Sequence, residues 1–358
     1  MNNYNIKPLL YRSLLFLIAP VLFMHSESNA QIHERKLMGL EGKWKFSIGD
    51  DMKWKDARFD DSKWEEIKAP SDWEEQGFNG YDGYAWYRKH FNFSQDLKGK
   101  QLFLNMGYID DVDEVYLNGV LIGRTGTFPP HYETAYNANR VYPLPEGIVK
   151  LSGDNVLCVR VYDAQLNGGI TSGSIGLFTR DSYSLPDLVL EGMWSFHTGD
   201  DMKWAEKDFN DTQWNMIKVP AHWEPQGYPD YDGFAWYRKS FNLPSYLNGK
   251  DLVLLMGKID DKDEVYFNGR QIGHIGNMKN KEVNDRDYQT LRVYQVPKDL
   301  LQQVNVVAVR VYDGYRDGGI YEGPVGLITK DKYEQFRSVY KQQYQRQRKN
   351  FFQLLFGW

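Results

Sequence analysis

Residues 109–122 read IDDVDEVYLNGVLI, and residues 259–272 repeat the pattern as IDDKDEVYFNGRQI. In the first copy, residues 113–117 and 120–122 flank Asn118-Gly119, and Asn268-Gly269 stands at the same place in the second copy. Asn-Gly between two alternating runs is the strongest short-range signal for a β-hairpin, because both residues adopt positive φ angles easily. The stretch therefore predicts antiparallel β-structure twice in one chain.

The whole chain repeats itself at a spacing of 150 residues. The sequence GDDMKW at residues 49–54 recurs at 199–204, AWYRK at 85–89 recurs at 235–239, and VRVYD at 159–163 recurs at 309–313. Solenoid repeats have periods of about 20 to 50 residues, so each copy here is long enough to be a domain. The copies fall out of step by two residues between residues 126 and 142, which predicts a loop there.

Period-two patterns predict the main strands. Residues 85–93 place Tyr87 and Phe91 on one face and Trp86 and Arg88 on the other, which predicts a half-buried strand. Residues 156–162 are almost continuously apolar, which is typical of a central strand buried on both faces. Cys158, the one cysteine of the chain, lies in this run, so we expect a small buried side chain and no internal disulfide.

The sequence predicts an all-β protein with two tandem jelly-roll β-sandwiches. Short strands separated by Gly, Pro, Asn and Asp turns favour this class over helical ones. We place module 1 at residues 38–183, module 2 at residues 188–333 and an amphipathic helical tail at residues 334–358. The tail has three interpretations: a helix packed on its own domain, which is favoured, a docking segment for a partner protein, and an interfacial membrane contact.

Residues 1–30 have the pattern of a secretory signal peptide. A positive start with Lys7 and Arg12 precedes an apolar run from residue 14 to residue 24, and the small residues 28–30 suggest a cleavage site. No later stretch reaches the ~20 apolar residues of a transmembrane helix. We therefore expect a secreted protein, located in the periplasm or at the cell surface.

The charge distribution argues against nucleic acid as a partner. The chain carries a net charge of −5, but residues 1–30 carry +1 and residues 331–358 carry +4, which leaves −10 on the rest. An acidic body repels a phosphate backbone.

Aromatic and polar side chains of the kind that bind sugars occur together in each copy. Sugar recognition uses ring faces for the C–H side of a pyranose and fixed polar groups for its hydroxyls. For each tryptophan, core packing or loop bracing is the favoured alternative. The candidate sugar-binding residues are Trp73, Tyr81, Asp82, Trp86, Arg88, Asp110 and Asp163 in module 1 and Trp223, Tyr231, Asp232, Trp236, Arg238, Asp260 and Asp313 in module 2.

Acidic residues are concentrated just before the predicted hairpin, at residues 109–114 and 259–264. Asp110, Asp111 and Asp113 could form a calcium site or a general acid–base pair, but adjacent residues of an extended chain point to opposite faces. We favour turn capping and pairing with Arg88 or Arg160, and we expect no catalytic residue, no metal and no cofactor. Residues 60–64 and 210–214 predict capped turns that hold a tryptophan, and Gly168-Gly169 predicts a close approach of the backbone to another group.

These motifs together resemble a known family. The pattern Pro70, Trp73, Gly77, Trp86-Tyr-Arg-Lys89, Gly107, Ile109-Asp-Asp-x-Asp113, Asn118-Gly119, Arg140-Val-Tyr142, Val159-Arg-Val-Tyr-Asp163 and Gly-Gly-Ile170 resembles the galactose-binding-like, sugar-binding jelly-roll domain of glycoside hydrolase family 2, and it resembles the related domain of sialate O-acetylesterases more closely. The resemblance appears twice. It implies that the catalytic residues of those enzymes belong to other domains, so none is transferred to this chain.

The leading hypothesis is a secreted carbohydrate-binding protein that recognises an oligosaccharide or polysaccharide without a catalytic domain of its own. One alternative is an enzyme, a glycosidase or carbohydrate esterase that uses the acids of residues 110–113. Another is a structural subunit that recruits a catalytic partner through the C-terminal tail.

Overall fold

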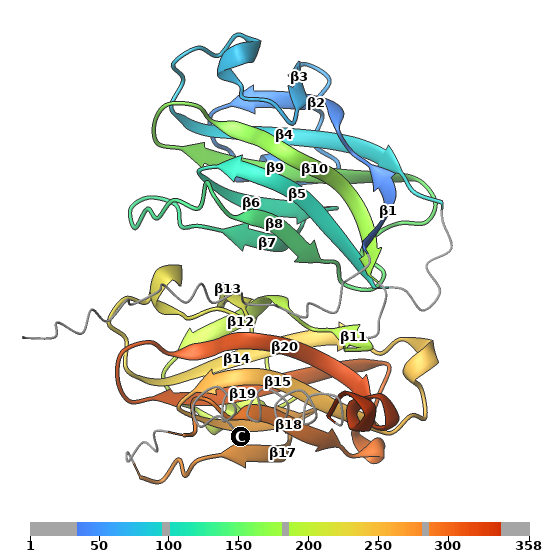
Figure 1. Ribbon diagram of the computed structural model, residues 1–358, viewed down its shortest axis with the longest axis vertical. Helices are drawn as coiled ribbons and strands as arrows, with labels where there is room; N and C mark the ends of the chain where they lie inside the picture. Colours follow the sequence, from blue (N-terminus) through green and yellow to red (C-terminus); the bar gives the residue numbers. More distant parts are fainter. Residues whose placement is uncertain (1–33, 95–100, 181–185, 281–285, 338–358) are drawn as a thin grey trace, which may run out of the picture. The chain divides into compact units, whose positions relative to one another are not determined.

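The computed structural model describes residues 34–94, 101–180, 186–280 and 286–337 (Figure 1). The predicted signal peptide, the connection at residues 181–185 and residues 338–358 of the tail lie outside the described residues. The described part confirms the predicted class, since it forms two jelly-roll β-sandwiches, each made of two antiparallel sheets, and one short C-terminal helix.

Module 1 contains a six-stranded sheet in the order β3-β2-β4-β9-β6-β7 and a four-stranded sheet in the order β1-β10-β5-β8. All neighbouring strands are antiparallel. The strands are β1 (Glu34–Gly39), β2 (Gly42–Ile48), β3 (Glu65–Ala69), β4 (Gly83–Asn92), β5 (Leu102–Asp110), β6 (Val112–Leu117), β7 (Val120–Thr125), β8 (Asn139–Pro143), β9 (Asp154–Asp163) and β10 (Gly169–Arg180).

Module 2 repeats this topology with the orders β13-β12-β14-β19-β16-β17 and β11-β20-β15-β18. The strands are β11 (Leu188–Val189), β12 (Gly192–Thr198), β13 (Asn215–Val219), β14 (Gly233–Asn242), β15 (Leu252–Asp260), β16 (Lys262–Phe267), β17 (Arg270–Ile275), β18 (Leu291–Val296), β19 (Val304–Asp313) and β20 (Gly319–Thr329). Short 3₁₀ turns lie between them, at η1 (Met52–Lys55), η2 (Glu74–Gln76), η3 (Met202–Ala205), η4 (Glu224–Gln226), η5 (Ser245–Leu247) and η6 (Lys298–Leu300).

The predicted hairpins are confirmed in both modules. β6 pairs with β7 and β16 pairs with β17, each across a two-residue Asn-Gly turn. Asn118 and Gly119 have φ angles of 53° and 84°, and Asn268 and Gly269 have φ angles of 49° and 86°. Both turn residues therefore adopt the left-handed conformation that this turn type requires.

The core of each module lies between its two sheets. In module 1, Val159 and Val161 of β9 pack in the same buried cluster as Leu104 and Met106 of β5. The opposite face of β9 is also buried, because Cys158 belongs to a second cluster. β9 is therefore the central strand that the apolar run predicts, and Cys158 is buried as expected.

The prediction that residues 85–93 form a half-buried strand is wrong for the outward face of β4. Trp86 is buried because Trp54 and Trp64, from the segment between β2 and β3, cover that face. The predicted turn at residues 60–64 is present and is capped by the side chain of Asp60, which accepts a hydrogen bond from the backbone N–H of Ser62 at 3.0 Å. The alternating pattern of β4 alone does not show that another segment covers its outward face.

Residues 330–337 are helical in the described part of the tail. Tyr333, at the end of module 2, packs against Val253 and Ile328. The three interpretations of the tail remain predictions, since most of its residues lie outside the described part. Among the described residues, no helix has the length and apolar character needed to cross a membrane.

Candidate functional site

Four of the candidate sugar-binding residues are tryptophans of the interior. Trp73, Trp86, Trp223 and Trp236 are each 0% exposed. The indole of Trp73 donates to the carbonyl oxygen of Tyr81 at 3.2 Å, and that of Trp86 donates to Asp50 at 2.9 Å. Such rings offer no face to a ligand, so they brace the modules.

The candidate arginines Arg88 and Arg238 are also buried and hold the covering loops. Arg88 donates from Nε to Asp61 at 2.8 Å and from its guanidinium to the carbonyl oxygen of Asp56 at 3.1 Å. Arg238 makes the corresponding bonds to Asp211 and Glu206, at 3.1 and 3.0 Å. The Arg of the repeated Trp-Tyr-Arg-Lys motif is therefore structural in both modules.

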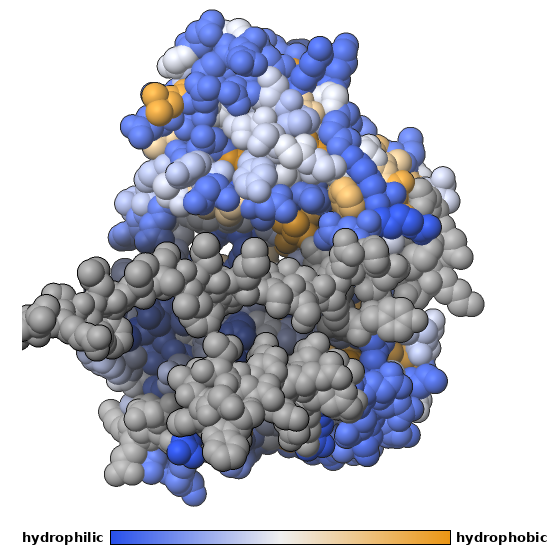
Figure 2. Space-filling model, in the orientation of Figure 1, coloured by the Kyte–Doolittle hydropathy of each residue, from blue (hydrophilic) through white to orange (hydrophobic). Residues whose placement is uncertain are grey.

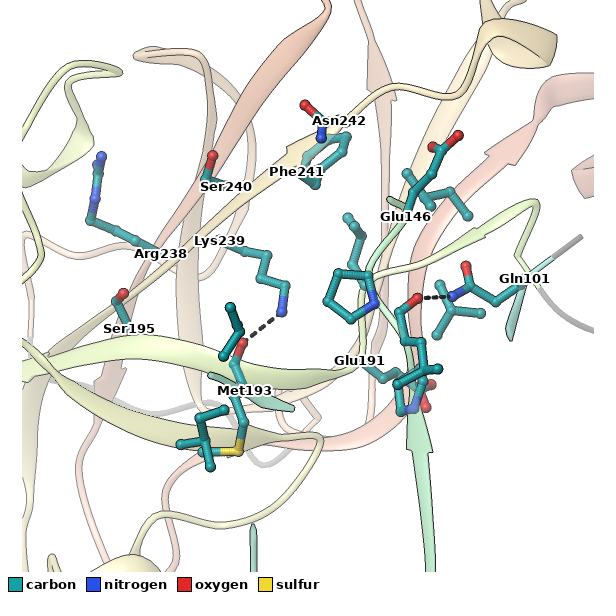
Figure 3. A pocket seen from close by; sticks show the side chains of 18 of the residues that line it. Gln101, Glu146, Glu191, Met193, Ser195, Arg238, Lys239, Ser240, Phe241 and Asn242 are labelled. Atoms are coloured by element: carbon teal, nitrogen blue, oxygen red, sulfur yellow. Dashed lines mark hydrogen bonds between the residues drawn. The ribbon is translucent and has the colours of Figure 1, made fainter. Parts of the chain in front are cut away.

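The lysine that ends the same motif has a structural role as well. Lys239 donates to the carbonyl oxygen of Met193 at 2.6 Å, a bond that Figure 3 shows. Its counterpart Lys89 donates to the carbonyl oxygen of Lys43, also at 2.6 Å. These bonds tie β14 to β12 and β4 to β2.

Tyr81 and Tyr231 are half-buried, while Asp82 and Asp232 are exposed. The hydroxyl of Tyr81 donates to the carbonyl oxygen of Tyr84 at 2.7 Å, and that of Tyr231 donates to Phe234 at 2.6 Å. The tyrosines therefore close a turn, and the two aspartates remain available to a ligand.

The remaining candidates belong to a cluster of carboxylates that occurs once in each module. Asp110, Asp111 and Asp163 form triad 1, and Asp260, Asp261 and Asp313 form triad 2. In each triad, one carboxylate oxygen from each residue lies within 4.8 Å of the others. The first aspartate is half-buried, and the other two are buried. The candidate site of each module is this triad.

The triads form where the chain passes from one sheet to the other. Asp110 ends β5 in the four-stranded sheet, and β6 of the six-stranded sheet begins at Val112. Asp163 ends β9, which pairs with β6. The expectation that adjacent acids point to opposite faces is wrong for Asp110 and Asp111, because strand alternation does not continue through a change of sheet.

Asp110 and Asp163 are among the predicted sugar-binding residues, whereas Asp111 is predicted only as part of a calcium site or of an acid–base pair. Asp111 accepts hydrogen bonds from the backbone N–H of Ala164, at 3.0 Å, and from the hydroxyl of Thr134. Its counterpart Asp261 accepts one from the backbone N–H of Gly314, also at 3.0 Å. The second aspartate of each triad therefore ties β5 to the loop after β9, or β15 to the loop after β19.

The third aspartate of each triad has one oxygen without a partner. Oδ1 of Asp163 accepts a hydrogen bond from the backbone N–H of Gln165 at 3.3 Å, and Oδ1 of Asp313 accepts one from Tyr315 at 3.3 Å. Oδ2 of each residue is buried and has no hydrogen-bond partner among the described residues. Both side chains are 0% exposed. A buried acceptor left in this state costs about 1–3 kcal/mol of stability.

Burial and mutual repulsion change the protonation of the triads. Burial raises the pKa of Asp163 to about 7, and the charges of Asp111 and Asp110 add to this effect. Burial and the neighbouring Asp111 raise the pKa of Asp110 to about 7 as well. In module 2 the pKa values of Asp260 and Asp313 are raised to about 7 for the same reasons. The triads therefore hold carboxylates that take up protons near neutral pH.

A buried arginine binds the backbone of each triad. Arg140 pairs with Asp113 at 2.7 Å, and both side chains are 0% exposed. Arg140 also donates to the backbone carbonyl oxygens of Asp111 at 2.9 Å and of Ala135 at 2.6 Å. Arg292 pairs with Asp263 at 2.7 Å and donates to the carbonyl oxygen of Asp261 at 2.8 Å. Each arginine thus fixes the triad backbone.

The expected pairing of the acids with Arg88 or Arg160 is only partly correct. Asp113 pairs with Arg140, and Arg88 pairs with Asp61. Glu114 does pair with Arg160, at 3.1 Å. The repeated Arg-x-Tyr at residues 140–142 and 292–294 was the available signal for the true partner, because Tyr142 also donates to Asp113, at 2.6 Å.

Different side chains surround the two triads. In module 1, Tyr132 is half-buried and lies near Asp111. Burial, together with the interaction with Asp111, raises the pKa of the Tyr132 hydroxyl. In module 2, the ring of His222 stacks on that of Tyr321, with centroids 4.9 Å apart and planes 7° apart. Burial and then the charge of Asp260 raise the pKa of Tyr321 to about 12. Each triad therefore has an aromatic ring beside it.

The paired glycines lie close to the module's own core. A Cβ atom on Gly168 would come within 2.3 Å of the Trp73 ring, and one on Gly318 would come within 2.1 Å of the Trp223 ring. The predicted close approach of the backbone is confirmed, and the neighbouring group is the buried indole.

Comparison with known proteins gives partial matches. Residues 49–167 match the family described as the second all-β domain of β-galactosidase. A β-glucuronidase of Formosa agariphila is 31% identical over 85 residues, which are 23% of this chain and 8% of the relative, and β-galactosidase BoGH2A of Bacteroides ovatus is 26% identical over 132 residues, which are 33% of this chain and 14% of the relative.

Among solved structures, a β-glucuronidase of Bacteroides uniformis is 16% identical, with a TM-score of 0.35 over 79% of this chain and 28% of that protein. The chain thus spans a small part of each of these proteins. It has partial homology to the non-catalytic β-domains of family 2 glycosidases.

Proposed function

We propose that the chain is an exported, non-catalytic carbohydrate-binding protein and that each module binds its glycan at the triad. The partial homology places it in a carbohydrate context. The resemblance to sialate O-acetylesterases and the location in the periplasm or at the cell surface remain predictions from the sequence.

The observation that carries the proposal is the pairing of a half-buried carboxylate with a half-buried ring in both modules. Asp110 lies in the same site as Tyr132, and Asp260 lies near Tyr321. Sugar hydroxyls donate hydrogen bonds to carboxylates, and the apolar face of a pyranose packs on an aromatic ring. The exposed Asp82 and Asp232 contribute to the charge around Asp163 and Asp313, which favours a hydroxyl-rich ligand over an anionic one.

The surface agrees with a polar ligand. On the face drawn in Figure 2, the described residues are mostly hydrophilic, and hydrophobic residues appear only in small groups. We expect the half-buried rings of Tyr132 and Tyr321 to supply the apolar contacts with the glycan.

A glycan array followed by calorimetry on the full chain tests this function. We expect binding that falls about tenfold in the double variant Tyr132→Ala, Tyr321→Ala, because an aromatic contact contributes about 0.5–1.5 kcal/mol beyond the area that it buries. Tyr246→Ala is the matched control, since Tyr246 is 38% exposed on η5 and should leave binding unchanged. No binding to any glycan, or equal binding by the double variant, would reject the proposal.

The protonation of triad 1 favours a hydrolase as a second candidate. The pKa of Asp110 is raised to about 7, whereas hydrogen bonds from Thr134 and Tyr132 outweigh burial and lower the pKa of Asp111. Acid–base catalysis uses two carboxyl groups whose pKa values are separated in this way. A screen with chromogenic glycosides and acetyl esters decides the matter: turnover must be present in the wild type and absent in Asp110→Asn.

A further inference from the structure

We propose that each triad binds a calcium ion. The ion would occupy the same triads at which we propose that the glycan binds, but its binding needs no glycan and goes beyond that function. It rests on the unpartnered buried oxygen of the third aspartate, on the separation of the carboxylate oxygens and on the chemistry of the donor set.

The buried oxygen of the third aspartate is available as a cation ligand. Oδ2 of Asp163 has no donor among the described residues, although the side chain is 0% exposed and belongs to the triad. Oδ2 of Asp313 is in the same state in module 2, where the surrounding loops have different sequences. The same unpartnered oxygen occurs in both copies of the repeat, so it belongs to the shared fold, and a ligand common to both sites would account for it.

The spacing of the oxygens suits calcium. The three carboxylate oxygens lie within 4.8 Å of one another. Two ligands on opposite sides of a Ca²⁺ ion are separated by about twice the Ca–O distance of 2.3–2.6 Å, so all three oxygens can reach one ion. The donors are oxygen atoms only, which favours a hard cation over zinc or copper.

The second aspartate of triad 1 is held in place by bonds that do not involve an ion. Asp111 is fixed by Ala164 and Thr134, and Arg140 binds the carbonyl oxygen of Asp111. Arg140 itself is occupied by Asp113, so its charge is already paired. The half-buried side of the site, at Asp110, leaves room for the water molecules that complete a calcium coordination shell.

The two sites should differ in affinity. Lys262 stands in module 2 where module 1 has Val112, and its charge lies close enough to act on Asp261. Lys262 is buried, and its ammonium donates to the carbonyl oxygen of Asn280 at 2.9 Å. A fixed positive charge beside the carboxylates opposes a second cation, so triad 1 should bind calcium more tightly than triad 2.

Calorimetry with CaCl₂ on the chelator-stripped full chain, without sugar, tests the inference. We expect two sites in the wild type, loss of the tighter site in Asp163→Asn, loss of the weaker site in Asp313→Asn and no binding in the double variant. Asp299→Asn, which changes an exposed aspartate paired with Arg270, should keep both sites. Lys262→Val should bring the weaker site toward the affinity of the tighter one.

Thermal unfolding separates loss of a ligand from loss of the fold. Calcium should raise the unfolding temperature of the wild type, and the double Asn variant should not respond to calcium. In EDTA the double variant should unfold at or above the wild-type temperature, because the substitutions remove repulsion within the triads. If either Asn variant does not fold, Asp110→Asn and Asp260→Asn replace them at the half-buried positions.

The results distinguish this inference from the proposed function. Three results would each reject the calcium site. The first is no heat of binding at millimolar calcium, the second is an unfolding temperature that is equal in calcium and in EDTA, and the third is calcium binding retained by the double variant. Glycan binding that persists in EDTA would show that the proposed function does not require calcium. Calcium binding by a chain that binds no glycan would support the calcium site and reject the proposed function.

Discussion

Arg140 of module 1 and Arg292 of module 2 donate hydrogen bonds to carbonyl oxygens in loops of different length and sequence. Each arginine also forms an ion pair with a buried aspartate and donates a hydrogen bond to a backbone carbonyl oxygen of a triad. Tyr132, in the loop itself, lies near triad 1, whereas the stacked rings of His222 and Tyr321 lie near triad 2. The same buried arginine–aspartate pair therefore supports both triads, while the loops and rings beside the triads differ. Such differences are expected of two sites that bind different ligands.

Removing the shared support should have the largest effect. In Arg140→Met, Asp113 would be buried without its partner, and loss of one member of a buried ion pair costs about 3–5 kcal/mol. We expect this loss in module 1 and little change in module 2, measured by hydrogen exchange in peptides of β6 and β16. Arg292→Met should produce the reverse pattern.

The double variant Arg140→Met, Asp113→Asn supplies the control for that prediction. It should recover part of the lost stability, because the uncompensated charge is removed. Equal protection of β6 in the wild type and in Arg140→Met would show that the buried pair does not hold the module together.

The sequence was sufficient for features that depend on near neighbours. The Asn118-Gly119 hairpin and the apolar run of β9 are local patterns, and each predicted the observed strand. Cys158 was placed correctly because its counterpart is an alanine. Such patterns are set by backbone conformation and alternation, which a single sequence reveals.

Features that depend on distant segments could not be read in this way. Trp73 and Trp86 have the composition of a sugar-binding platform, but their rings are covered by segments far away in the sequence. Triad 1 joins Asp110 and Asp111 to Asp163 across a change of sheet, so the alternation rule gave the wrong answer there. Of the fourteen candidate residues, those at the triads required the fold to bring them together.

Cys158 and Ala308 offer a milder comparison of the two cores. Burial raises the pKa of the Cys158 thiol to about 12, so the folded protein should not react with iodoacetamide at pH 8. Cys158→Ala copies module 2 and removes one buried sulfur atom, which should lower the stability of module 1 by about 1 kcal/mol. Alkylation rates in native and denaturing buffer measure the first effect, and hydrogen exchange in β9 measures the second. Rapid alkylation of the native protein would contradict burial.

The smallest expected effect concerns His90, whose counterpart in module 2 is Ser240. The ring of His90 lies 2.6 Å from a carboxylate oxygen of Asp154 and 3.0 Å from one of Asp61. Burial lowers the pKa of His90, but the hydrogen bonds and charges of these two aspartates outweigh it, so the net pKa is raised above 6.5. Protonated His90 therefore stabilises module 1.

Because the pKa is raised in the folded state, this stabilisation is complete below the unfolded value of about 6.5 and is lost as the pH rises through the folded value. The His90 side chain is 41% exposed and that of Asp154 is 51% exposed, so solvent limits the effect to about 0.2–1 kcal/mol. His90→Ser should lower the stability of module 1 at pH 5.5 and have almost no effect at pH 8.5. The triad acids titrate in the same range, but the wild type and the variant share them, so the difference isolates His90. A difference in unfolding free energy that is independent of pH would show that His90 acts through packing, and its dependence on salt at pH 5.5 would then be absent as well.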